Sequence, residues 1–154
     1  MPQTLEEYHA EIERMMAQGD ALVASRGAAS EDLVKQRIAD TLLILASYQL
    51  FVHRKVFAPM LERADATTRA RVNELKVECI ALTEDLRFNV RELMARADDA
   101  PLDWDVVAVG VAWFNGRVRA HIAQVRQMMA PELSDADHAR LRAHRNDLVG
   151  AQAA

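Results

Sequence analysis

Apolar residues recur at spacings of three and four along most of the chain, which is the period of one face of an α-helix. The pattern predicts four long amphipathic helices, at about 4–25, 30–58, 67–97 and 104–130, and a short fifth helix at about 134–149. No stretch alternates with period two for long enough to predict a strand. We therefore predict an all-α fold in which the four long helices form an up-down-up-down four-helix bundle.

Polar residues that favour helix starts precede each apolar run. Thr4 is followed three residues later by Glu7, the spacing of a capping box. Gly27 is expected to end the first helix and Pro131 to close the fourth. Pro59 is expected near the end of the second helix, whose last turn either frays or continues a little beyond it. The other expected caps are Ser30, Thr67 or Thr68, Asp103 or Asp99, and Ser134 with Asp137.

Length and composition indicate one globular domain over 1–154. The chain is 51% hydrophobic and 27% charged, with a formal net charge of −4 and a pI of about 5.7. Its arginines are scattered among acids, so we expect no nucleic-acid partner, because such partners select clustered Lys and Arg. The single cysteine, Cys79, excludes an internal disulfide and a cysteine-based zinc site.

The N-terminal segment and the longest apolar run argue against export and membrane insertion. The N-terminal sequence, MPQTLEEYHAEIERMM, is acidic and periodic rather than basic and then apolar, so it does not have the pattern of a signal peptide. The run TLLILASYQLFV is too short and too polar to span a bilayer. We predict a cytoplasmic protein with no membrane partner.

The informative positions are the polar residues on the inner faces of the predicted helices. His9, Gln49, His53, Glu78 and His121 place at least one imidazole, carboxylate or amide on each of the four helices. Any one of them alone is more typical of a satisfied core residue or of a surface residue. Their convergence on one bundle axis instead predicts ligands for one or two iron, manganese or zinc ions.

A short sequence pattern is repeated near the ends of the second and fourth predicted helices. The segment YQLFVHRKVFAPML covers 48–61, and AHIAQVRQMMAPEL covers 120–133. Aligning Pro59 with Pro131 sets Gln49 against His121 and places His53 four residues later, about one helical turn away. The repeat therefore predicts that these helices end in the same way and that the position of the histidine has changed between them.

The segment HIAQVRQMMAPELSDADHARL resembles the last helix and tail of hemerythrin-like (HHE cation-binding) domains. That resemblance implies a four-helix bundle with a non-haem diiron centre. In that family the second and fourth helices carry His-x-x-x-Glu, with a proline six residues after the Glu, and the first and third helices contribute one histidine each. On this pattern, His9 matches the ligand of the first helix and His121 the histidine of the fourth.

The chain departs from the family pattern at the other ligand positions. Gln49 stands where the second helix has its histidine, and His53 stands where it has its glutamate. Val125 replaces the glutamate of the fourth helix, and Glu78 is the nearest inward-facing candidate on the third. The resemblance thus implies a remodelled ligand set of His9, Gln49, His53, Glu78 and His121, without the two bridging glutamates.

Two functions follow as hypotheses. The first is a hemerythrin-like metal-binding bundle, with mononuclear or dinuclear non-haem iron, that binds dioxygen or another small diatomic for sensing or handles iron. The second is a metal-free helical bundle that binds a protein partner, a second copy of itself or a small apolar ligand. The sequence contains no Gly-rich phosphate loop, no nucleophile motif and no His-Glu-x-x-His, so no enzyme class is predicted.

Overall fold

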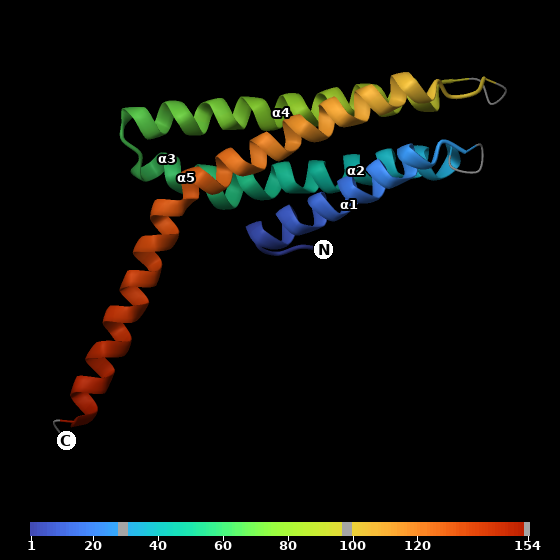
Figure 1. Ribbon diagram of the computed structural model, residues 1–154. Coiled ribbons are helices and arrows are strands. Elements are labelled where there is room, and N and C mark those ends of the chain that lie inside the picture. Colours follow the sequence, from blue (N-terminus) through green and yellow to red (C-terminus); the bar gives the residue numbers. More distant parts are fainter. Residues whose placement is uncertain (28–30, 97–99, 153–154) are drawn as a thin grey trace. The chain divides into compact units, whose positions relative to one another are not determined.

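Every regular element of the protein is a helix in the part that the structure describes (Figure 1). The structure is a computed structural model, and it describes residues 1–27, 31–96 and 100–152. Over 132–152 it describes the backbone and, of the side chains, only those of residues 142, 143 and 145. The predicted all-α class is confirmed.

The helices follow one another along the chain with short connections. They are α1 (Leu5–Ser25), α2 (Glu31–Val52), the π-helix η2 (His53–Phe57), α3 (Ala58–Arg63), α4 (Ala66–Met94) and α5 (Trp104–Gln152). The chain divides into two compact units, Met1–His121 and Ile122–Ala154. The first unit holds α1 to α4 and the first part of α5, and in the second unit α5 continues to Gln152.

The start of α1 has the capping box that the sequence predicts. The Thr4 hydroxyl accepts a hydrogen bond from the Glu7 backbone N–H at 3.2 Å, and the Glu7 carboxylate accepts one from the Thr4 backbone N–H at 3.3 Å. These contacts satisfy donors that a helix start leaves unpaired. The helix ends at Ser25, and the next residue, Arg26, adopts a left-handed conformation with φ of 45°, directly before Gly27.

The cap of α4 differs from the prediction. Asp65, rather than Thr67 or Thr68, caps the helix, because its carboxylate accepts a hydrogen bond from the Thr68 backbone N–H at 2.7 Å. For α5, Asp103 accepts from the backbone N–H groups two and three residues ahead, as one of the two alternatives predicted. Ser30 and Asp99 lie outside the described residues.

The second predicted helix continues past Pro59. Directly after α2, the backbone widens into the π-helix η2, in which the Ala58 N–H donates to the His53 carbonyl. Pro59 then lies in the first turn of α3, which ends at Arg63. In a regular α-helix the proline ring would clash with the carbonyl four residues before it. We attribute the tolerance of Pro59 to this wider turn.

The separate fifth helix is not formed, so that prediction was wrong. The backbone stays helical from Trp104 to Gln152, with Pro131 inside α5. A proline inside a helix removes one hydrogen bond, whereas ending and restarting the helix would expose a set of unpaired carbonyl and N–H groups. The side chain of Ser134, the expected cap, lies outside the described residues.

The four long helical segments of the first unit share one core. α1 packs against α2, and α2 against α4. Polar contacts tie the first part of α5 to α1 through Asn115 and Asp20, at 2.8 Å, and to α4 through Arg117 and Asp85, at 2.7 Å. The side chains left least exposed include those of Ile12, Tyr48, Val52, Phe57, Val72, Leu75 and Val118.

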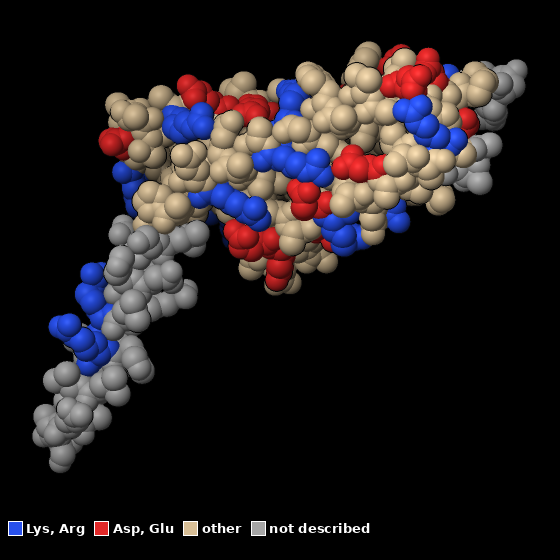
Figure 2. Space-filling model, in the orientation of Figure 1, with Lys and Arg blue, Asp and Glu red and all other residues tan. Residues whose placement is uncertain are grey.

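Charged side chains of both signs are interspersed on the face of the first unit that Figure 2 shows. On the face shown in Figure 2, Lys and Arg lie among Asp and Glu, as in the pair of Arg119 with Glu13 at 2.9 Å. Within the described ranges, no helix has the length of apolar sequence that a bilayer span requires.

The start of α4 gives a test of the cap assignment. Replacing Asp65 by Ala removes the acceptor for the Thr68 N–H and should lower the midpoint of thermal unfolding by roughly 2–4 °C. Thr67→Ala is the matched control, because Thr67 is exposed and caps nothing. Thermal unfolding followed by circular dichroism measures both variants. An equal or larger effect of Thr67→Ala would contradict the assignment of Asp65 and favour the threonine cap predicted from the sequence.

Candidate functional site

His9 and Tyr48 join α1 to α2 inside the first unit. The His9 side chain is 1% exposed, and its Nε2 lies 3.3 Å from the Tyr48 hydroxyl. Tyr48 is equally buried, and the centres of the two rings are 5.5 Å apart. His9 is therefore held by a neighbouring hydroxyl group, as expected for a polar side chain in a core.

His121 contacts the same tyrosine from α5. Its ring centre lies 6.1 Å from that of Tyr48, and the rings meet edge to face at 85°. His121 is 1% exposed. The Tyr48 ring on α2 thus contacts buried histidines from both α1 and α5, so these three helices meet at Tyr48.

Glu78 brings a carboxylate from α4 to His121. Its Oε2 lies 3.8 Å from Nδ1 of His121, which is too long for a hydrogen bond. The Glu78 side chain is about one-third exposed, whereas that of His121 is enclosed. Among the described residues, neither Nδ1 nor Nε2 of His121 has a hydrogen-bond partner, although both atoms are buried.

His53 is the second imidazole near His121. It lies on η2, directly after α2, with its ring centre 5.5 Å from that of Phe57. The ring is half-buried, and its Nε2 is buried with no hydrogen-bond partner in the described part of the chain. The pKa of His53 is lowered, first by burial and then by the positive charge of Lys76.

Burial keeps the imidazole of His121 neutral. It lowers the pKa of His121 to about 4, and the proximity of His53 contributes in the same direction. Glu78 does not reverse this shift, because at 3.8 Å and partly hydrated its attraction is weaker than the cost of enclosing a charge. At neutral pH, His121 therefore presents an unprotonated nitrogen lone pair, the form that binds a metal.

Gln49 does not take the buried position that the sequence predicts. It is only half-buried, and the preceding residue, Tyr48, occupies the core. One residue corresponds to about 100° of rotation around a helix, so a small error in the predicted stripe exchanges the buried side chain for its neighbour. Cys79 is buried, and its pKa is raised to about 12 by burial and by the charge of Glu78.

The predicted ligands are thus gathered only in part. Glu78 lies 3.8 Å from His121, His53 is near enough to lower the pKa of His121, and His9 meets the same tyrosine as His121, Tyr48. As the side chains lie, the described residues contain no three His, Cys, Asp or Glu groups close enough to hold one ion. Tyr48 is the residue whose role the sequence pattern missed, because an aromatic ring on a helix face is typical of packing alone.

The shifted pKa of His121 predicts a loss of stability in acid. Unfolded His121, with its ordinary pKa of 6.5, takes up a proton that the folded ring excludes down to about pH 4. The free energy of unfolding should therefore fall as the pH drops from about 6.5 to about 4, by on the order of 3 kcal/mol from this group, and His53 adds in the same direction.

Urea unfolding at a series of pH values measures this dependence. His121→Gln should flatten the slope between pH 6.5 and pH 4, whatever its effect on absolute stability. A slope that is the same in both proteins would contradict a neutral buried imidazole at this position.

Comparison of the chain with protein-family models, with curated proteins and with solved structures yielded no match. Any function assigned to the chain is therefore inferred from its own residues.

Proposed function

We propose that the chain is a metal-binding protein whose four long helical segments form an up-down-up-down, hemerythrin-like bundle. The site would hold a single divalent transition-metal ion, with iron as the first candidate, between His53, Glu78 and His121. The observation that carries the proposal is the buried imidazole of His121, which lies 3.8 Å from the partly exposed Glu78 carboxylate and has no hydrogen-bond partner among the described residues. The half-buried His53 adds a second imidazole whose Nε2 is unpaired within the same described ranges.

Energetics support a ligand for these nitrogens. A buried polar atom without a partner costs about 1–3 kcal/mol, so natural cores rarely keep several of them together. Three such atoms belong to His53 and His121 in the part of the chain described. A metal ion accepts lone pairs from neutral imidazoles, and the lowered pKa values of both residues keep them in that form.

The donor set fits one ion better than two. Two histidines and one carboxylate are the ligands typical of mononuclear non-haem Fe(II) sites, which leave positions open for dioxygen or another diatomic. The diiron centre implied by the resemblance does not fit this chain, because His53 and Val125 stand where the bridging glutamates would be. His9 is also engaged by Tyr48 rather than directed at a common ion.

The π-helix adds independent support. π-turns inside helical segments are frequent at functional sites, because they redirect side chains that a regular helix would space evenly. Here the widened turn begins at His53 itself. Closing a coordination shell requires rotation of side chains, and the Glu78 side chain, about one-third exposed, is not enclosed by the core as His121 is.

The test is a metal titration of the chelator-treated protein. Isothermal calorimetry with Fe²⁺ under nitrogen, and with Co²⁺ as a coloured substitute, should give one ion per chain. Glu78→Gln should weaken binding by at least roughly tenfold, because it removes the only charged ligand of the proposed set. Glu74→Gln is the matched control, since Glu74 lies one turn earlier on α4 and pairs with Arg71 at the surface.

The outcomes separate the hypotheses. Saturable binding that is lost in Glu78→Gln and in His121→Gln, and kept in Glu74→Gln, supports the proposed site. Absence of saturable binding, or equal weakening in Glu78→Gln and Glu74→Gln, would overturn it in favour of the metal-free module. Binding of two ions per chain would overturn the mononuclear assignment.

A further inference from the structure

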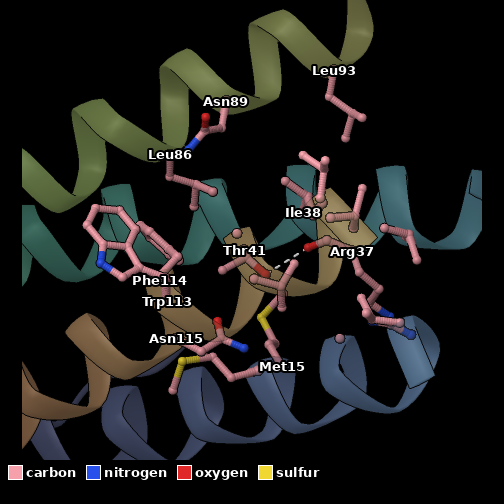
Figure 3. A pocket seen from close by; sticks show the side chains of 18 residues that line it. Met15, Arg37, Ile38, Thr41, Leu86, Asn89, Leu93, Trp113, Phe114 and Asn115 are labelled. Atoms are coloured by element: carbon pink, nitrogen blue, oxygen red, sulfur yellow. Dashed lines mark hydrogen bonds between the residues drawn. The ribbon is translucent and has the colours of Figure 1, made fainter. Parts of the chain in front are cut away.

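A cavity of about 370 Å³ lies in the other half of the first unit, away from the histidines (Figure 3). It is bordered by the C-terminal half of α1, the N-terminal half of α2, the C-terminal half of α4 and the start of α5. In Figure 3 the side chains of Met15, Ile38, Leu86 and Phe114 approach it from these four helices. All of its lining residues belong to the first unit.

The size and lining of the cavity suit a small apolar molecule. Apolar side chains that line an open hollow of this size face water rather than other apolar atoms, which costs free energy that an apolar ligand would recover. Ligand pockets are typically about 300–1,000 Å³ and mostly apolar. The rim is apolar as well: Val106 is 67% exposed and Trp113 is 62% exposed.

Two glycines line the cavity. Gly19 on α1 and Gly110 on α5 line it, and a Cβ atom at either position would meet no atom within 4 Å. Both lie inside helices, where glycine costs roughly 0.5–1 kcal/mol relative to alanine. Packing therefore does not require glycine at these positions, whereas a side chain there would reduce the space available to a ligand.

The polar groups of the lining indicate the charge of the ligand. Asn115 is already engaged, since its amide donates to Asp20 at 2.8 Å, and Asp20 also pairs with Arg119 at 3.3 Å. The Thr41 hydroxyl donates to the backbone carbonyl of Arg37. The Arg37 guanidinium itself makes no ion pair with any carboxylate that the structure describes, which leaves a positive charge at the cavity. An anionic head group complements it.

We propose that this cavity binds a free amphiphilic carboxylic acid, with its apolar tail among Met15, Leu86 and Phe114 and its carboxylate at Arg37. The site goes beyond the proposed metal function, because the lining includes none of His53, Glu78 and His121. Binding should therefore persist in the presence of a chelator.

The first experiment fills the cavity. Decanoate, kept below its micellar concentration and in EDTA, is titrated into the full chain by calorimetry, and Trp113 fluorescence gives a second readout. The wild-type protein should bind one decanoate per chain. Gly110→Leu places a side chain where the cavity is open and should weaken binding by at least roughly tenfold.

Gly116→Leu is the matched control for the filled cavity. It makes the same change on the same helix, also with no atom within 4 Å of an added Cβ, but Gly116 does not line the cavity. It should bind decanoate as the wild type does. No saturable binding by the wild type, or equal binding by the two leucine variants, would overturn the proposal.

The second experiment tests the head group. Arg37→Gln should weaken decanoate binding by about two- to fivefold, the range expected for a partly exposed ion pair, and should leave the binding of decanol unchanged. Equal effects on decanoate and decanol would overturn the role of Arg37. A dimer that forms with rising protein concentration and excludes decanoate would assign the cavity to a second copy of the chain instead.

Discussion

The packing of Tyr48 is the contact on which the first unit depends. Its ring meets His9 from α1 and His121 from α5, and all three side chains are almost completely enclosed. A buried tyrosine has a large apolar ring and one polar hydroxyl group, and here the hydroxyl lies within hydrogen-bond distance of His9. Because burial disfavours a charge on His121, its imidazole stays neutral in the core. The chemistry proposed for the site follows from that constraint.

The helices could be predicted from periodicity because each buries one face and exposes the other. The capping box of Thr4 and Glu7 could also be predicted, because it depends only on residues three positions apart in the sequence. Asp65 was missed because several residues before α4 can cap a helix, and the backbone rather than the residue type decides which one does. Gln49 was misplaced for a related reason: the apolar face of α2 is broad, and Tyr48 beside it fills the core better.

The two prolines show a limit of local rules. Pro131 was expected to end its helix and Pro59 to lie near the end of its own, and each lies within a longer helical segment. Before Pro59 the backbone forms a π-turn over His53–Phe57. The spacing of apolar residues does not predict such a turn, because it depends on how these residues pack. At Pro131 the helix gives up one hydrogen bond and continues. The repeated sequence pattern around these prolines therefore belongs to two helical segments that each continue past a proline. One does so through a π-helix before Pro59, and the other as a continuous α-helix around Pro131.

The histidine group and the cavity occupy opposite halves of the same helices. α1 contributes His9 to one and Met15 to the other, and α5 contributes His121 and Phe114 in the same way. Unpaired buried nitrogens and apolar side chains that face water both cost free energy in a folded protein. A domain has only about 5–15 kcal/mol of net stability, so the unit depends on the core between these features, including Ile12 and Leu82. A ligand that fills either feature would therefore stabilise the fold as well as bind to it.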